Sequence, residues 1–335
     1  MKRLVVTGGA GFIGSNFVRR MVNRCPDYRI TVLDVMTYAG NLENLAGLLD
    51  GEKVKFVKGD IRDREIVREV LRDADMVVNF AAESFVDRSI LEPDGFITTD
   101  VLGAFVLLEA AKEFGLEKFL QVSTDEVYGS VEEGSSTELD AILPNSPYSA
   151  SKAGGDLLAR SYFVTYGVPV VMTRGSNTYG PYQHPEKLIP LFISNAVDDK
   201  PLPVYGDGGQ VRDWLYVEDH CSAVDLVLHK GTPGEAYNVG GGCERTNMHV
   251  TSLILQYLEK PSSLIRYVTD RPGHDRRYSL NCDKLRGLGW DTTKQFEDGL
   301  KETVEWYLQN QDWWRKVKDS DSYREFNRTW YSDRK

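Results

Sequence analysis

The sequence predicts an α/β protein built on a doubly wound parallel sheet, with a smaller interleaved α/β domain toward the C-terminus. Short apolar runs alternate with longer segments of helical pattern, and the runs are continuously apolar rather than alternating. Continuous apolar character indicates strands that are covered on both faces, and the intervening segments supply the covering helices. A glycine-rich turn directly after the first run favours the same fold.

The strands are expected, in order, at RLVV (3–6), RITVLD (29–34), VKFV (54–57), MVVNFAA (76–82), KFLQVS (118–123) and VPVVMTR (168–174). After Arg174 the pattern becomes irregular, because five prolines fall between residues 181 and 203. A helix at 217–230 and a strand at 235–240 follow. We therefore assign 1–174, with about 215–240 returning to it, to the first domain, and 175–214 with 241–335 to the second. The tail from about Glu302 is expected to be helical and packed on the body.

Composition limits the function. The 335 residues are 41% hydrophobic and 27% charged, which suits sizeable cores rather than disorder. The net charge of -10 disfavours nucleic acid or an anionic membrane as the main partner. Four scattered cysteines and five histidines show no zinc-type spacing, so no metal site is predicted. The chain starts MKRLVV immediately before the glycine motif, and no apolar run approaches the ~18 residues of a membrane span, so we expect no signal peptide and a cytoplasmic location.

The first chemical motif is TGGAGFIGS, residues 7–15. Its glycines, Gly8, Gly11 and Gly14, allow a tight turn, close approach of the backbone to a pyrophosphate, and close packing of the next helix. Asp34 ends the second strand, where an acid hydrogen-bonds a ribose 2′-hydroxyl and repels a 2′-phosphate, so the motif predicts NAD rather than NADP. The predicted cofactor site also includes Phe12, Ile13, Asp60, Ile61, Ala81 and Ala82. An ordinary turn explains Asp60 and Ile61 equally well.

The second motif is YSASK, at the start of a predicted helix. Tyr148 and Lys152 are four residues apart and share one helix face, so the ammonium is expected to lower the pKa of the phenol toward the working pH. The spacing alone is common by chance. Together with the glycine motif, and with Ser123 and Thr124 at a strand end, it favours a base at a redox site.

The third motif, STDEVYG (123–129), places two neighbouring carboxylates, Asp125 and Glu126, where the fifth strand ends. Open α/β sheets carry their chemistry at this edge. An acidic solvated turn is the alternative explanation.

Together these motifs resemble the extended short-chain dehydrogenase/reductase family, which has a Rossmann-like fold. STDEVYG and four further segments look like its dTDP-glucose 4,6-dehydratase branch: AAESFVDRSI (81–90), SNTYGPYQHPEKLIP (176–190), PLPVYGDGGQVRDWLYVEDH (201–220) and DRPGHDRRYSL (270–280). The resemblance covers nearly the whole chain. It implies an NAD-dependent hydro-lyase acting on dTDP-glucose.

The resemblance also implies roles for five residues. Tyr148, assisted by Lys152, removes the 4-hydroxyl proton while hydride leaves carbon 4 for NAD, and Thr124 hydrogen-bonds the new carbonyl. Glu126 then takes the carbon-5 proton, protonated Asp125 expels the 6-hydroxyl as water, and hydride returns to carbon 6. Asp125 needs a raised pKa, which burial and a second carboxylate would give. A 4-epimerase moves hydride at one carbon only and has no use for this pair, and a non-enzymatic NAD sensor would be expected to have lost part of the redox set.

Substrate contacts are carried over from the same branch. On the sugar side they are Ser84, Asp87, Arg88 and Thr124; around the nucleotide diphosphate they are Asn177, Lys187, Leu188, Pro203, Tyr205, Arg212, Asn247, Arg271 and His274. Two positions depart from the branch: Phe85 replaces a usual His, and Thr178 replaces a usual second Asn. They leave the choice of sugar and base open, so UDP-glucose or another nucleotide sugar remains an alternative substrate for a dehydratase or 4-epimerase.

Two segments predict self-association. Residues 94–115 are apolar nearly all round, and the helix from Tyr148 carries more apolar residues than one sheet face needs. We therefore expect a C2 homodimer in which two helices from each subunit form a four-helix bundle.

Overall fold

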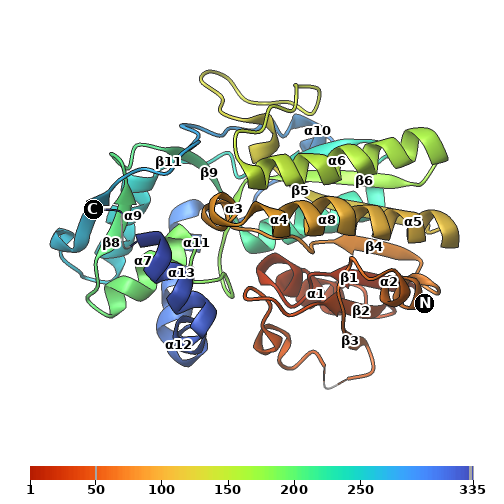
Figure 1. Ribbon diagram of the computed structural model, residues 1–335, viewed down its shortest axis with the longest axis horizontal. Helices are drawn as coiled ribbons and strands as arrows, with labels where there is room; N and C mark the ends of the chain where they lie inside the picture. The colour runs from red at the N-terminus through yellow and green to blue at the C-terminus, as the bar shows by residue number, and fades with distance from the viewer. Residues whose placement is uncertain (50, 332–333, 335) are drawn as a thin grey trace.

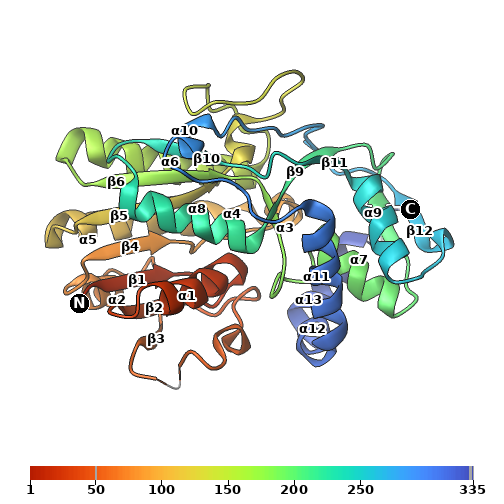
Figure 2. The same ribbon diagram turned by 180° about the vertical axis from the view of Figure 1, so that it is seen from behind.

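The computed structural model describes residues 1–49, 51–331 and 334. Figures 1 and 2 show a larger lobe built around a broad sheet and a smaller lobe that holds α7, α9, α12 and α13. Among the helices that the structure describes, none combines the length and the apolar composition that crossing a membrane requires.

The larger lobe contains a parallel sheet, seven-stranded within the described residues, with the order β10-β6-β5-β4-β1-β2-β3. Its strands are β1 (Arg3–Thr7), β2 (Arg29–Asp34), β3 (Val54–Lys58), β4 (Met76–Asn79), β5 (Lys118–Thr124), β6 (Val170–Gly175) and β10 (Ala236–Val239). The predicted strands and the doubly wound sheet are confirmed. The fourth strand is shorter than predicted, because the chain leaves the sheet after Asn79 to line a cavity. The strand order reverses between β1 and β4, the position where open sheets bind ligands.

Two helical layers cover this sheet. On one face, α1 (Phe12–Arg24) packs on α8 (Val217–Lys230), and both bury apolar side chains against the strands. The other face is covered by α2 (Arg64–Leu71), α5 (Ala104–Phe114) and α6 (Pro147–Tyr166). Helix α8 has the predicted bounds. It comes after the irregular middle segment, so the chain returns to the larger lobe to complete this layer.

The segment predicted as one apolar helix, 94–115, has three parts. A short turn α4 (Pro93–Phe96) leads into a π-helical stretch η2 (Ile97–Gly103) and then into α5, after α3 (Val86–Leu91). This run packs against α6 at very close range, because a Cβ at Gly155 would lie 2.8 Å from the carbonyl oxygen of Asp100. The paired helices leave apolar side chains exposed: Leu157 is 52% exposed and Val164 64%.

The smaller lobe has two short sheets, β11-β9-β7 and β12-β8. Its strands are β7 (Asn177–Tyr179), β8 (Leu202–Tyr205), β9 (Val211–Tyr216), β11 (Glu244–Thr246) and β12 (Ile265–Val268). The helices of this lobe include α7 (Leu188–Val197), α9 (Asn247–Tyr257), α11 (Phe296–Gln309), α12 (Gln311–Asp319) and α13 (Asp321–Tyr331). An aromatic core with Tyr179, Trp214 and Trp314 joins most of them. The short helix α10 (Asp283–Arg286) packs on β10 of the larger lobe instead. The tail is helical and packed, as predicted.

Candidate active site

A cavity of about 460 Å³ opens at the carboxyl ends of β1, β2, β4 and β5. Its floor is the glycine turn after β1. Gly8 has a φ of +66°, and a Cβ there would lie 2.6 Å from the backbone nitrogen of Ala81, so only glycine fits. Gly11 begins α1 without a side-chain cap, which leaves the helix N-terminus available to an anion. The turn therefore fits a pyrophosphate.

Asp34 fixes the far end of this cavity. It ends β2, and its carboxylate accepts hydrogen bonds from the backbone N–H of Ala10 at 3.0 Å and of Met36 at 2.8 Å. Burial raises its pKa, and these two hydrogen bonds lower it. The carboxylate is thus held at the place where an adenosine ribose would meet it, and the residues present fit a dinucleotide. All predicted cofactor residues line this cavity: Gly8, Gly11, Phe12, Ile13, Gly14, Asp34, Asp60, Ile61, Ala81, Ala82, Tyr148 and Lys152.

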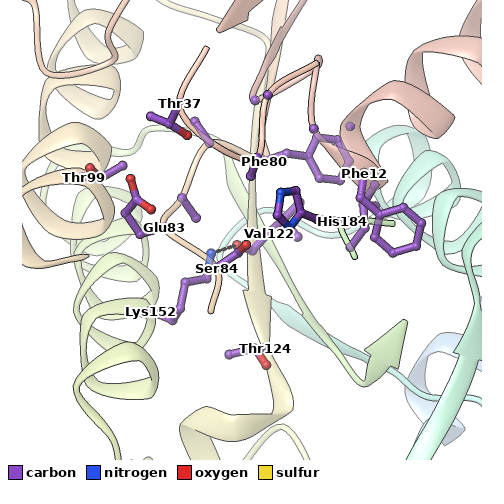
Figure 3. Close-up of a pocket in the computed structure, with 18 of the residues that line it drawn as sticks. Phe12, Thr37, Phe80, Glu83, Ser84, Thr99, Val122, Thr124, Lys152 and His184 are labelled. Carbon is purple, nitrogen blue, oxygen red and sulfur yellow. Dashed lines mark hydrogen bonds between the residues drawn. The ribbon is translucent and has the colours of Figure 1, made fainter. Parts of the chain in front are cut away.

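Helix α6 brings Tyr148 and Lys152 to the cavity from the other side. Ser146 caps the helix reciprocally with Ser149, and Pro147 starts the first turn. Figure 3 shows Lys152 reaching toward β5, where its Nζ donates to the carbonyl oxygen of Val122 at 2.7 Å. The local sequence thus sets both the helix start and the face that reaches the cavity.

The expected lowering of the Tyr148 pKa is wrong for the protein alone. Burial raises it well above its ordinary value, and the carboxylates of Glu126, Asp100 and Asp125 raise it further, while a hydrogen bond with Thr124 lowers it. Burial also lowers the pKa of Lys152, against the pull of Asp100. Tyr148 and Lys152 do lie four residues apart on α6, as predicted. The carboxylates that raise the pKa of Tyr148 belong to other elements.

Asp125 lies at the start of a short turn, η3 (Asp125–Tyr128), that follows β5. It is 3% exposed, and its Oδ1 accepts a hydrogen bond from the Thr124 hydroxyl at 3.1 Å. Its Oδ2 has no hydrogen-bond partner among the described residues. Burial raises its pKa well above the usual range, and Glu126 and Asp213 add to the effect. The raised pKa of Asp125 that the sequence predicts is therefore confirmed. A neutral carboxyl in this place can act as a proton donor.

Glu126 has a different environment, although it is the next residue. Burial raises its pKa, but the cations Arg271, Arg212 and Lys187 lower it. Burial raises both pKa values, but the charges nearest Asp125 are mainly the carboxylates of Glu126 and Asp213, which raise its pKa further, whereas those nearest Glu126 are mainly cations, which lower its pKa. Such a difference separates an acid from a base.

A second cavity of about 130 Å³ extends from Glu126 toward the smaller lobe. Ten predicted substrate residues line it: Asp87, Asn177, Lys187, Leu188, Pro203, Tyr205, Arg212, Asn247, Arg271 and His274. Ser84 and Thr124 line the first cavity. Glu126, Asn177 and Lys187 line both, so the two cavities meet beside the carboxylate pair.

Arg88 has another position. Its guanidinium makes two hydrogen bonds with Glu186 and lies 3.8 Å from the centre of the Tyr38 ring. The ion pair is largely buried. Arg88 therefore does not line either cavity, in contrast to the predicted substrate contact.

Sequence reasoning missed other lining residues. Glu83 and His184 face the first cavity from opposite sides (Figure 3). Burial and the nearby Asp100 raise the pKa of Glu83 to about 7, and burial lowers that of His184 to about 3. Both stand inside motifs that were singled out, AAES and QHPEK, so a closer reading of those segments would have found them. Tyr331 lines the second cavity and had no sequence signal.

The chain is similar to known nucleotide-sugar enzymes over most of its length. Residues 5–303 match the family model described as GDP-mannose 4,6 dehydratase. The chain is 52% identical to dTDP-glucose 4,6-dehydratase of Xanthomonas campestris pv. campestris, over 97% of this chain and 98% of that protein. It is also 52% identical to the low-salt glycan biosynthesis protein Agl12 of Haloferax volcanii, over 91% of this chain and 98% of that protein.

Among solved structures, DesIV, a dTDP-glucose 4,6-dehydratase from Streptomyces venezuelae crystallised with NAD, superposes with a TM-score of 0.92 at 51% identity. The match covers 94% of this chain and 99% of that chain. Matches of this length and identity show the family to which the chain belongs. The chain belongs to the dTDP-glucose 4,6-dehydratase branch of the extended short-chain dehydrogenase/reductase family.

Proposed function

We propose that the chain is an NAD-dependent dTDP-glucose 4,6-dehydratase, a hydro-lyase that forms dTDP-4-keto-6-deoxyglucose. The observation that carries the proposal is the Asp125–Glu126 pair, which shares a cavity with Tyr148 and Lys152 and in which carboxylates predominate beside Asp125 and cations beside Glu126. When bound, NAD supplies a hydride acceptor for carbon 4 and returns that hydride to carbon 6. The relatives named above support the choice of substrate.

The oxidation step belongs to Tyr148, which takes the proton of the 4-hydroxyl. Because burial and nearby carboxylates raise the pKa of Tyr148, removal of its own proton depends on the hydrogen bond with Thr124 and on the charge of Lys152. Thr124 then holds the new carbonyl oxygen. The ketone acidifies the hydrogen on carbon 5, which prepares the elimination.

The elimination belongs to the two carboxyls. Glu126 takes the proton from carbon 5, and Asp125 gives its proton to the 6-hydroxyl, which leaves as water. Adding hydride at carbon 6 and returning the Glu126 proton to carbon 5 completes the product. Burial favours the neutral form of both carboxyls; the cations beside Glu126 oppose it there, and the carboxylates beside Asp125 reinforce it, as the two roles require.

The second cavity is proposed to bind the nucleotide diphosphate. Arg212 is buried and donates to the backbone carbonyl oxygens of Val211 at 2.8 Å and Asp275 at 3.0 Å, which fixes its position. With Lys187 and Arg271 it offers positive charge to the phosphates. This gives the two parts of the chain separate tasks: 1–174 with about 215–240 binds NAD, and 175–214 with 241–335 binds the nucleotide sugar.

The decisive experiment compares turnover of dTDP-glucose and UDP-glucose, with the alkaline chromophore of the 4-keto product as readout. The proposal expects the chromophore with dTDP-glucose and a lower rate with UDP-glucose. A 4-epimerized sugar without the chromophore would instead support a 4-epimerase. A higher rate with UDP-glucose would support the proposed 4,6-dehydration but would make UDP-glucose the preferred substrate.

The chain is also proposed to form a C2 homodimer through a four-helix bundle. The support is the exposed apolar surface of the paired helices, which includes Leu102, Leu157 and Val164. Changing Leu102 and Leu157 together to Asp should yield monomers in sedimentation velocity. Leu139→Asp is the matched control, because Leu139 is 95% exposed on a different segment. A parent protein that sediments as a monomer at micromolar concentration would refute the dimer.

A cytoplasmic location is proposed from the thiols. Cys25, Cys221, Cys243 and Cys282 are all free, which suits a reducing compartment. Titration of the denatured protein, purified without reductant, should find every cysteine as a thiol. Disulfides in that sample would contradict the proposal.

A further inference from the structure

Helix α13, the last helix among the described residues, reaches the second cavity. Tyr331, at the end of α13, lines the second cavity together with Pro203 and Tyr205, two of the residues expected around the nucleotide diphosphate. Figures 1 and 2 show α13 alongside α7, whose residues form another part of the same wall. A segment more than a hundred residues away from β8 in the sequence therefore helps to enclose the nucleotide.

An aromatic contact docks α13 at this position. Phe326 packs edge-on against Phe85 with ring centres 5.4 Å apart, and Trp330 stacks on Phe326 at 6.1 Å. The Phe85 ring also lies 4.8 Å from the ammonium of Lys187, one of the cations of the second cavity. Phe85 thus contacts both α13 and that cation.

A chain of hydrogen bonds links α13 to the phosphate-binding side. The indole N–H of Trp330 donates to the Tyr205 hydroxyl at 2.5 Å, and that hydroxyl donates to Asp87 at 2.7 Å. Arg271 donates to the other oxygen of Asp87 at 2.7 Å. Because Tyr205 is held from both sides, its ring orientation depends on Trp330 as well as on Asp87.

Tyr331 stands between two spaces. On one side is the second cavity of about 130 Å³, and on the other is a third cavity of about 350 Å³ that shares Tyr331, Pro203 and Leu191 with it. Sites for small molecules usually measure ~300–1,000 Å³, so a nucleotide needs more room than the second cavity offers. Tyr331 lies at a helix end, and its hydroxyl is 3.4 Å from that of Tyr205, with the two rings only 18° from parallel. Tyr331 therefore forms part of the wall of both cavities, beside Tyr205.

We propose that α13 completes the nucleoside end of the substrate site. Tyr331 contacts the base or ribose of the bound nucleotide, and Trp330 is a positioning residue that orients Tyr205. This inference rests on the proposed function, which puts the nucleotide of the substrate in the second cavity. It adds a specificity-determining contact from the C-terminal helix.

The test measures dTDP binding by calorimetry and steady-state kinetics with dTDP-glucose. Tyr331→Ala should raise the Kd of dTDP and the KM roughly 5- to 100-fold, the range seen when an aromatic partner of a base is removed, with a smaller change in kcat. Tyr331→Phe should bind within about 3-fold of the parent, because the ring makes the contact. Trp330→Phe keeps a ring but loses the donor to Tyr205, and should raise the Kd about 2- to 10-fold.

Thr329→Ala is the control, since Thr329 is exposed on the same helix and should leave dTDP binding unchanged. The affinity for NAD is measured in every variant. Unchanged dTDP affinity in Tyr331→Ala overturns the inference, and so does a loss that is matched by an equal loss of NAD affinity, because α13 would then support only the fold. If the parent fails to dehydrate dTDP-glucose but binds dTDP in a Tyr331-dependent way, the proposed function fails and the inference stands.

Discussion

Replacing Asp125 by Asn tests the acid that separates dehydration from simple hydride transfer. The change removes the ionisable proton and keeps the size of the side chain. The Oδ1 position can still accept from Thr124, and the Oδ2 position, which has no partner among the described residues, can hold the amide nitrogen without displacing a hydrogen bond. General acid catalysis is worth about 10²–10⁴ in rate, so elimination should slow by that factor, or about 3 to 5 kcal/mol of activation free energy.

The oxidation step should survive, because Tyr148 and Lys152 reach the cavity from α6 and do not use the Asp125 proton. A single-turnover experiment should show the near-ultraviolet absorbance of reduced nicotinamide rising and persisting, with the 4-keto-glucose intermediate recoverable from the stalled enzyme. Tyr148→Phe is the control and should give no absorbance change. Dehydration at the parent rate by Asp125→Asn would refute the assignment.

Four other outcomes follow from the same geometry. Glu126→Gln should also stall after oxidation, but without exchanging the carbon-5 hydrogen with deuterated solvent; parental exchange would remove Glu126 as the base. Because burial raises the folded-state pKa of Asp125, the parent loses unfolding free energy as pH rises from the unfolded value of about 3.9 through the folded one. Asp125→Asn should therefore gain thermal stability over the parent as pH increases, and a pH-independent difference in melting temperature would contradict the burial argument. Gly8→Ala should abolish NAD binding, whereas Gly47→Ala, at a similar positive φ but with open space around it, should retain it; equal losses would mean that backbone strain alone is responsible. Purified protein should bind NAD in preference to NADP because Asp34 lies where a 2′-phosphate would be, and tight NADP binding would overturn that role.

The sheet was predictable because each buried strand has its own continuous apolar run, and α8 was predictable because its apolar periodicity is uninterrupted. The 94–115 segment was not, since its π-helical stretch depends on partners elsewhere: a Cβ at Gly103 would collide with Ile61, which follows β3. The local sequence pattern predicts that this segment is helical, but it does not predict a contact with a residue as distant in the sequence as Ile61.

The same limit applies to the site. The cofactor and catalytic residues predicted from the three motifs line the first cavity, because each motif stands at a strand end or helix start. The sign of the Tyr148 pKa shift was wrong, because it depends on Asp100 and Glu126, two carboxylates that sequence spacing does not place beside the phenol. Tyr331 was missed since its neighbour Tyr205 lies on a strand far away in the sequence.

The turn η3 puts Thr124, Asp125 and Glu126 at consecutive positions, and the hydroxyl of the first caps the backbone of the third at 3.3 Å. The two carboxyls proposed to carry out the dehydration are thus held on one anchored bend, whereas the charges that distinguish them come from Asp213, Arg212, Lys187 and Arg271 on other segments. A relative that only shuttles hydride and receives this bend alone would therefore acquire the two carboxyls without the charges that set their pKa values.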